Sequence, residues 1–184
     1  RWDTTIARLM AEGELPRNPF HSQGRQISIG EAKYNPIWAS IQADNFYRTV
    51  VFSNFLDAGV VGFYEWLQTT QGFVVQNQRA YQYIVRNLPA GQRYEVVLWD
   101  SDRFKEITQW QHAMDGTYKV LLLSPKAREG LSLKRVRVLH LMEPSWNKAA
   151  EEQAIGRAAR HMSHAELPPI QRTLRIRRWV AQYQ

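Results

Sequence analysis

The sequence lacks cysteine altogether, which excludes a disulfide framework and any zinc site built on thiolates. No stretch approaches the roughly 20 consecutive apolar residues that a membrane-spanning helix needs, so no membrane partner is expected. Residues 1–30 mix charged residues, glycine and proline without a continuous apolar segment, which excludes a typical secretory signal. There is no internal repeat and no low-complexity tract. Together these absences predict a folded, intracellular protein.

The positive charge of the chain is concentrated in its last third. The 184 residues suit one domain, and 44% hydrophobic with 22% charged residues is ordinary for a folded chain. Residues 1–125 hold 12 Lys and Arg against 12 Asp and Glu, whereas residues 126–184 hold 12 against 5, so the net charge of +7 lies there. Two interpretations follow: a surface for a polyanion such as nucleic acid or nucleotide, or solvated arginines without a partner molecule.

Short aliphatic and β-branched runs recur along the chain, with helical patterns between them. Several runs are almost continuously apolar, which is typical of strands covered on both faces. Strands that alternate with helices predict an α/β fold with a mainly parallel sheet and right-handed crossovers. The predicted strands are Arg48–Ser53, Gly72–Val75, Tyr94–Leu98, Tyr118–Leu123, Val136–Met142 and Leu174–Val180.

The segments between these runs carry apolar residues at helical spacing. Asp57–Gln68 and Asp102–Met114 each have an apolar stripe, and Asp102 is a typical N-cap residue. A helix is also expected over Pro36–Asn45, before the first strand. Three tryptophans within these patterns are expected in the core rather than at base-stacking sites: Trp38, Trp66 and Trp110.

Residues 147–160, NKAAEEQAIGRAAR, favour a helix with an unusual polar stripe. Gln153, Arg157 and Arg160 are spaced i, i+4 and i+7, so they share the face on which an amphipathic helix normally carries apolar residues. Two arginines one turn apart repel each other mildly unless an anion bridges them. Because a guanidinium binds phosphate oxygens in a bidentate way, the stripe predicts a phosphate site.

The rest of this helix fits the same interpretation. Its opposite side is small and allows close packing on a sheet, and Asn147 is a suitable N-cap. Glu151 and Glu152 lie near the positive end of the helix. The alternative is that Arg157 and Arg160 are solvated or pair with these two glutamates. The small residues are Ala150, Ala154 and Ala158.

Five ordered segments resemble motifs of superfamily-two helicases and translocases. Gln153–Arg160, QAIGRAAR, resembles motif VI, Q-x-x-G-R-x-x-R, and Ser124–Leu133 after a strand resembles motif V. Val136–Asn147 resembles the strand and Pro-x-Trp-Asn turn of Swi/Snf-like proteins, and Val50–Phe55 resembles motif IV. Arg160–Pro168, RHMSHAELP, is similar to a segment of helicases and transcription-associated ATPases of large DNA viruses. The resemblance implies the second RecA-like lobe of such a motor.

The resemblance implies that ATP with Mg²⁺ binds between two RecA-like lobes. Arg157 and Arg160 would be arginine fingers that stabilise charge developing on the γ-phosphate. Gln153 would lie near the nucleotide and help to couple it to lobe closure. Gly130 would let the backbone pass close to the nucleotide, with Glu129 beside it.

The same resemblance implies contacts with nucleic acid, and the Swi/Snf-like and viral patterns favour double-stranded DNA over RNA. Ser53 and Asn54, at the end of the motif IV strand, would touch the nucleic-acid backbone. Ser132 in motif V would lie beside it. Lys126 and Arg128 are added from their charge alone.

Two motifs of a complete motor are missing. The chain contains no G-x-x-x-x-G-K-[ST] and no D-E-x-x after an apolar strand, and both belong to the first lobe, which would hold ATP and Mg²⁺. We therefore expect residues 1–32 to be a linker or extension from a missing first lobe, encoded in the same chain or a partner chain, and residues 33–184 to be the second lobe. Pro125 also departs from motif V, since it stiffens a turn that is usually flexible.

Two interpretations are possible for each of three further features. His161 and His164 are spaced i, i+3, but without a third ligand nearby His164 is expected to orient a turn rather than to bind metal. Trp146 is expected to anchor its turn rather than to contact a ligand. The basic stretch Arg172–Arg178 is either a phosphate track or a charged strand at a sheet edge.

Three functions compete on this basis. The first is a motor lobe that hydrolyses ATP on nucleic acid together with a first lobe. The second is a non-catalytic nucleic-acid-binding or assembly subunit, for example in a viral transcription or packaging complex. The third is an α/β protein that binds another phosphate ligand. If the chain is viral, the virion, a viral factory, or the host nucleus or cytoplasm would be its location.

Overall fold

The computed structural model describes residues 30–45, 48–77, 82–99, 117–125, 132–144 and 148–180. Most of the predicted linker, the predicted helix Asp102–Met114, Trp110 and Trp146 lie outside these ranges. The first helix described, α3, spans Gly30–Asp44 and contains most of the helix predicted over Pro36–Asn45. The proposed boundary after residue 32 therefore falls inside a helix.

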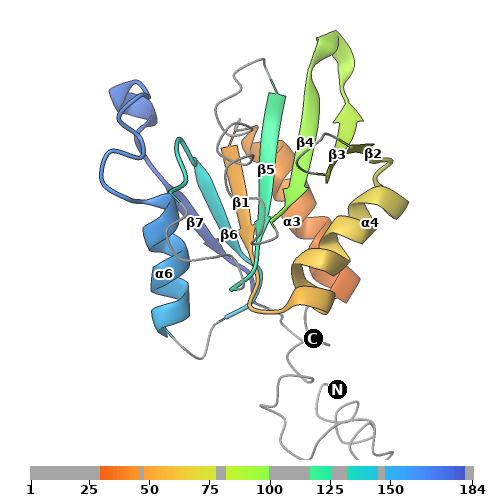
Figure 1. Cartoon of the computed structure of the whole chain (residues 1–184), viewed down its shortest axis with the longest axis horizontal. Helices are drawn as coiled ribbons and strands as arrows, with labels where there is room; N and C mark the ends of the chain where they lie inside the picture. The colour runs from red at the N-terminus through yellow and green to blue at the C-terminus, as the bar shows by residue number, and fades with distance from the viewer. Residues whose placement is uncertain are drawn as a thin grey trace, which may run out of the picture.

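A seven-stranded sheet forms the centre of the fold, in the order β2-β3-β4-β5-β1-β6-β7 (Figure 1). The prediction of a mainly parallel sheet is confirmed, because β4, β5, β1, β6 and β7 are parallel neighbours. Their bounds are β1 Arg48–Phe52, β4 Arg93–Leu98, β5 Thr117–Leu123, β6 Val138–Leu141 and β7 Arg175–Arg178.

Two antiparallel strands extend the sheet beyond β4. β2, Val74–Asn77, pairs with β3, Gln82–Asn87, and β3 pairs with β4. The predicted strand Gly72–Val75 begins too early, because Gly72 has a φ of +71°, a left-handed conformation that favours glycine and belongs to a turn. β3 was not predicted at all, since its short apolar centre is flanked by polar residues and has no distinct period.

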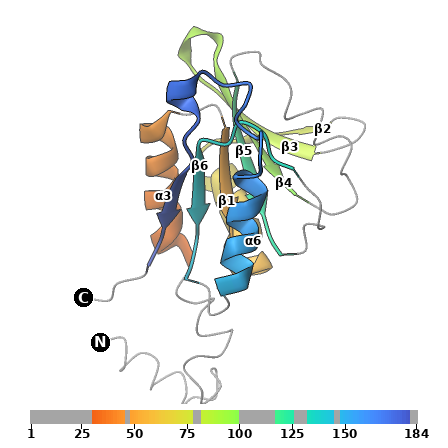
Figure 2. The ribbon, with the colours of Figure 1, turned by 90° about the vertical axis from the view of Figure 1, so that its left-hand side faces the viewer.

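Helices cover both faces of the sheet and complete three layers (Figure 2). α3 and α4, Gly62–Thr70, lie on one face, and α6, Lys148–Ala158, lies on the other. The helix predicted over Asp57–Gln68 forms in two parts, because a π-helical segment, η1 (Leu56–Val61), precedes α4 and is bent at Gly59. Two short 3-10 turns, Pro89–Gly91 and Pro169–Gln171, complete the regular structure.

The core has two halves, one on each face of the sheet. β5 is buried along its whole length, with Tyr118, Val120 and Leu122 packed on the α3 side and Leu121 and Leu123 on the α6 side. The predicted burial of two tryptophans is confirmed, since both pack between α3, α4 and the sheet: Trp38 and Trp66. Among the described helices, none is long and apolar enough to cross a membrane.

Candidate nucleotide and nucleic-acid sites

Helix α6 places the motif VI residues in three different environments. Ala154 and Ala158 are buried against the sheet, as predicted for the small side of this helix. Arg157 is buried with them, whereas Gln153 is exposed. The helix ends at Ala158, so the exposed Arg160 belongs to the following turn. The prediction that Gln153, Arg157 and Arg160 project together from one face is therefore wrong.

Arg157 is a mostly buried residue whose side chain has no partner among the described residues. The residue is 9% exposed, and its backbone oxygen accepts a hydrogen bond from the Leu133 N–H at 3.3 Å. Its side chain makes no hydrogen bond or ion pair with any described residue. A buried charge without a partner is unfavourable, so this arrangement suits an anion supplied from outside the described part of the chain.

Neither glutamate of α6 neutralises the two motif VI arginines. Glu151 accepts a hydrogen bond from Arg178 Nε at 2.6 Å, and Glu152 lies 3.7 Å from Lys148 Nζ. The alternative in which Arg157 and Arg160 pair with these glutamates is therefore wrong.

Arg160 connects motif VI with motif V. Its Nη1 donates a hydrogen bond to Ser132 Oγ at 2.9 Å. Ser132 lies at the start of the segment that leads into β6, and this segment, residues 132–136, runs beside residues 157–166. We call the two segments together the motif V–VI contact. It brings Ser132, which the resemblance had placed beside nucleic acid, into contact with the motif VI residue Arg160.

Further hydrogen bonds hold the motif V–VI contact. The Arg135 N–H donates to the Ser163 carbonyl at 2.9 Å. His164 Nε2 lies 2.6 Å from the Val136 carbonyl and its Nδ1 lies 2.8 Å from Ser163 Oγ. A carbonyl can only accept, so Nε2 carries a proton and donates it to the Val136 carbonyl. His164 thus orients the turn after motif VI, and no group of three metal-ligating residues occurs in the described chain.

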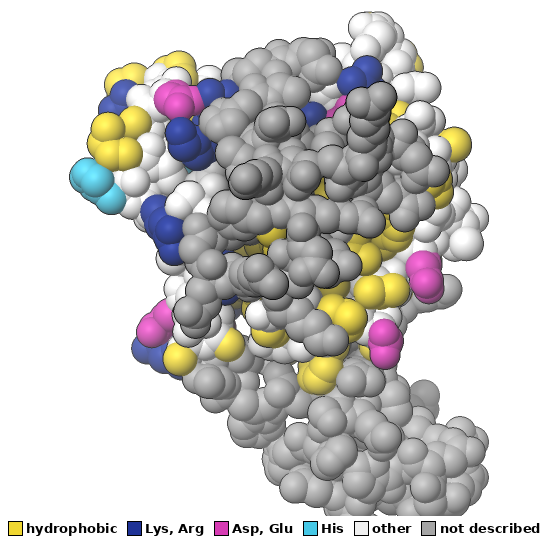
Figure 3. Space-filling view, in the orientation of Figure 1, with side chains coloured by type: hydrophobic (Ala, Val, Ile, Leu, Met, Phe, Trp, Pro, Cys, Tyr) yellow, Lys and Arg dark blue, Asp and Glu magenta, His cyan; other side chains and the backbone are white. Residues whose placement is uncertain are grey.

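Basic side chains gather on the side of the molecule formed by α6 and the following turn (Figure 3). The turn also exposes apolar residues, with Met162 and Ile170 at its surface.

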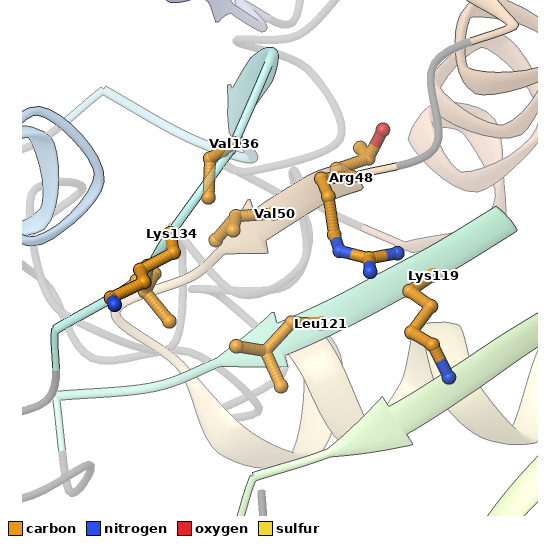
Figure 4. Close-up of a pocket in the computed structure, with 8 residues that line it drawn as sticks. Arg48, Val50, Lys119, Leu121, Lys134 and Val136 are labelled. Carbon is orange, nitrogen blue, oxygen red and sulfur yellow. The ribbon is translucent and has the colours of Figure 1, made fainter. Parts of the chain in front are cut away.

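A small hollow lies nearby, between β1, β5 and the segment before β6 (Figure 4). Arg48, Lys119 and Lys134 line it, and Lys119 Nζ is 2.7 Å from Glu95 Oε2.

A second group of polar residues lies at the opposite end of the sheet, where β1 and β6 end. Ser53 Oγ donates to Glu143 Oε2 at 2.9 Å, and Asn54 Nδ2 donates to Glu143 Oε1 at 3.0 Å. The Asn54 backbone N–H also donates to Glu143 Oε1. Asn54 is half-buried, but Ser53 is fully buried. The expectation that the Ser53 side chain touches nucleic acid is not met in this arrangement, since its hydroxyl is used within the fold.

Glu143 and Lys33 are polar residues that the sequence did not single out. Burial raises the pKa of the Glu143 carboxyl, while hydrogen bonds from Asn54 and Ser53 and the charge of Lys33 act in the opposite direction. Burial lowers the pKa of Lys33, which donates to the Met142 carbonyl at 2.9 Å. The available signal was a carboxylate placed directly after an apolar strand.

The basic strand β7 is the last strand in the sheet order, so it lies at an edge. Arg177 donates through Nε and Nη2 to Asp44 of α3. Arg178 reaches Glu151 of α6 on the other face. These pairs favour the interpretation of a charged edge strand over that of a phosphate track.

Four predicted site residues lie outside the described ranges, so the structure does not place them: Lys126, Arg128, Glu129 and Gly130. The predicted N-cap Asn147 also lies outside them.

The three layers, the strand order and the motif V–VI contact define a RecA-like α/β domain. Residues 33–162, more than two thirds of the chain, match the family described as Helicase conserved C-terminal domain. The chain belongs to this family, and the predicted resemblance to the C-terminal lobe of a viral superfamily-two helicase is confirmed.

Three of the similar proteins come from viruses. Two Acanthamoeba polyphaga mimivirus proteins, each named "Putative ATP-dependent RNA helicase", are 31% identical over 73% of this chain and 44% identical over 33% of it. A "Termination factor NPH-I homolog" of African swine fever virus is 46% identical over 30% of the chain. The chain spans 26% of the length of the first relative and 8% of each of the other two.

Proposed function

We propose that this domain is the C-terminal lobe of a viral, ATP-driven nucleic-acid helicase or translocase and that Arg157 and Arg160 act as its arginine fingers. The observation that carries the proposal is the mostly buried Arg157, whose side chain has no partner among the described residues. A γ-phosphate held by the first lobe would supply the missing negative charge. Arg160 lies on the same motif V–VI contact and would meet the same nucleotide.

ATP and Mg²⁺ would be held mainly by the first lobe, which carries the phosphate-binding loop in such motors. Arg157 and Arg160 would stabilise the charge that develops on the transferred phosphoryl group. The exposed Gln153, two turns before Arg160, would face the same nucleotide during lobe closure. Gly130 and Glu129 of motif V would lie beside it.

Nucleic acid would bind at the opposite end of the sheet, where parallel strands end. The half-buried Asn54 lies there, and Lys126 and Arg128, which follow β5 in the sequence, would contribute positive charge. Ser132 would link this motif V segment to the arginines. We favour double-stranded DNA, because the motif pattern is that of duplex translocases, although two relatives are named as RNA helicases.

ATP turnover tests this function. The 184-residue chain alone should hydrolyse no ATP, and the protein that contains both lobes should hydrolyse ATP faster with duplex DNA than with RNA or without nucleic acid. Binding of DNA should weaken steeply as salt rises. ATP hydrolysis by the isolated chain, or a two-lobed protein that nucleic acid does not stimulate, would contradict the proposal.

A further inference from the structure

The Glu143 carboxylate joins two segments that are far apart in the sequence. β1 and β6 are adjacent parallel strands with Phe52 paired to Leu141, so the residues that follow them meet at one edge. Glu143 accepts three hydrogen bonds from the turn after β1: from Ser53 Oγ, from the Asn54 backbone N–H and from Asn54 Nδ2. It is only 5% exposed. Five residues later the chain enters α6, which carries the arginines.

The turn is also held from its other side. Ser53 Oγ accepts a hydrogen bond from the Phe55 N–H at 3.1 Å. A Cβ at position 59 would lie 2.2 Å from Ser53 Oγ, so only glycine leaves room for this hydroxyl. Ser53 is therefore fixed between Phe55, Gly59 and Glu143, and the turn has one geometry.

The Glu143 carboxyl group also orients the side-chain amide of Asn54. Glu143 Oε1 accepts from both the backbone N–H and the Nδ2 of Asn54, so the Nδ2 side of the amide faces the carboxyl group. The second hydrogen of Nδ2 remains available to a ligand, since Asn54 makes no other side-chain bond with the described residues. An oriented N–H donor suits a phosphate oxygen. The positive charge of Lys33, which donates to the neighbouring Met142 carbonyl, offsets the repulsion between Glu143 and a phosphate.

We propose that Glu143 is a positioning residue that orients the Asn54 amide toward a nucleic-acid phosphate and ties this contact to the segment entering α6. The inference rests on the proposed function, because it explains how Glu143 would position the proposed nucleic-acid contact of Asn54. Glu143 itself does not touch the nucleic acid. Its effect on binding passes through Asn54.

The test is a double-mutant cycle on DNA binding. Fluorescence anisotropy with a labelled DNA duplex gives the affinity of the 184-residue chain and of the N54A, E143A, N54A/E143A and E143Q variants. N54A and E143A should each weaken binding about tenfold, the size expected for one hydrogen bond to a charged group. The double variant should be no weaker than N54A, because coupled residues are not additive. Circular dichroism melts identify any variant that does not fold.

A conservative variant separates orientation from charge. In E143Q the Oε1 atom still accepts from Asn54, and Nε2–H can donate to Ser53 Oγ, so binding should stay within about twofold of wild type. E143D retracts the carboxylate by one methylene and should weaken binding as E143A does; it covers the case in which E143A does not fold. E65A, which removes an exposed carboxylate of α4, is the matched control and should bind like wild type.

Several results would overturn the inference and leave the proposed function intact. These are an E143A effect that persists in the N54A background, an N54A variant that binds like wild type, and an E143Q variant as weak as E143A. Failure of the wild-type chain to bind DNA or RNA at all would instead count against the proposed nucleic-acid contact itself.

Discussion

Arg157 combines a buried position with a charge that no described residue neutralises. The small neighbours Ala154 and Ala158 bring the helix close to the sheet, and the segment before β6 covers it. In a purely structural arginine this burial would be compensated by a carboxylate or by carbonyl oxygens. No described residue provides such compensation for Arg157. This is the environment that we expect for an arginine whose partner is a nucleotide phosphate.

A methionine at position 157 should therefore stabilise the isolated chain. R157M keeps much of the side-chain volume and removes a charge that has no partner among the described residues, so the free energy of unfolding should rise by about 1 kcal/mol. Urea unfolding followed by circular dichroism measures this change. R160M is the control, since Arg160 is exposed and should alter stability by less than about 0.5 kcal/mol. Destabilisation by R157M would indicate a structural arginine instead.

His140 should make the stability of the fold depend on pH. Burial lowers its pKa from 6.5 to about 4, although the charge of Asp44 opposes this shift. Above pH 6.5 the side chain is neutral in both states and has no effect. As the pH falls through 6.5 the unfolded chain binds a proton that the folded chain refuses until about pH 4, a loss of about 3 kcal/mol.

The His140→Phe variant isolates this effect. Its unfolding free energy should fall less steeply than that of wild type between pH 6.5 and pH 4. Chemical unfolding at a series of pH values measures the difference. The loss of the hydrogen bond from Trp179 Nε1 to His140 Nδ1 affects all pH values alike, so parallel curves would contradict the shifted pKa.

At the scale of elements, β7 connects the two helical layers. Successive arginines on a strand point to opposite faces, and here Arg177 reaches Asp44 of α3 while Arg178 reaches Glu151 of α6. β7 thus fixes the start of the arginine-bearing helix relative to the sheet. The exposed edge strand is also protected by its charges against pairing with other chains.

Loss of the Arg177 side chain should cost more stability than loss of Arg175. R177A leaves the Asp44 carboxylate, 7% exposed, without its two hydrogen bonds, and we expect a loss of about 1–2 kcal/mol after allowance for the exposure of Arg177. Arg175 is more exposed and lies 3.8 Å from Asp44, so R175A should cost less than about 0.5 kcal/mol. Equal losses in thermal or urea unfolding would show that β7 does not hold α3 in this way.

The elements differ in how well their sequence predicts them. β1 and β5 were predictable because each is an apolar run buried on both faces, and α4 because its stripe follows the helical period. β3 was missed because an antiparallel strand with three central apolar residues has too little pattern. The spacing of the motif VI residues identified them in the sequence. Their different environments could not be predicted, because the end of α6 at Ala158 depends on packing with the segment before β6.

At the scale of the whole molecule, the two groups of motif residues are separated by the length of the sheet. Ser53, Asn54 and Glu143 lie where β1 and β6 end, and the motif V–VI contact lies where β6 begins. Helix α6 runs between the two ends (Figure 2). Sequence motifs predicted both groups, but not that Ser53 would be buried or that Glu143 would hold the turn, since both depend on which strands become neighbours.

ATP hydrolysis by the two-lobed protein with saturating duplex DNA tests the central claim most directly. R157A and R160A should each lower the stimulated turnover by roughly 10³-fold or more, as expected for arginine fingers, while the affinity for ATP changes little. The matched control is R172A, whose side chain, among the described residues, donates to carbonyl oxygens of its own turn; its loss should leave turnover near wild type. A loss of less than about tenfold in both R157A and R160A would contradict the account.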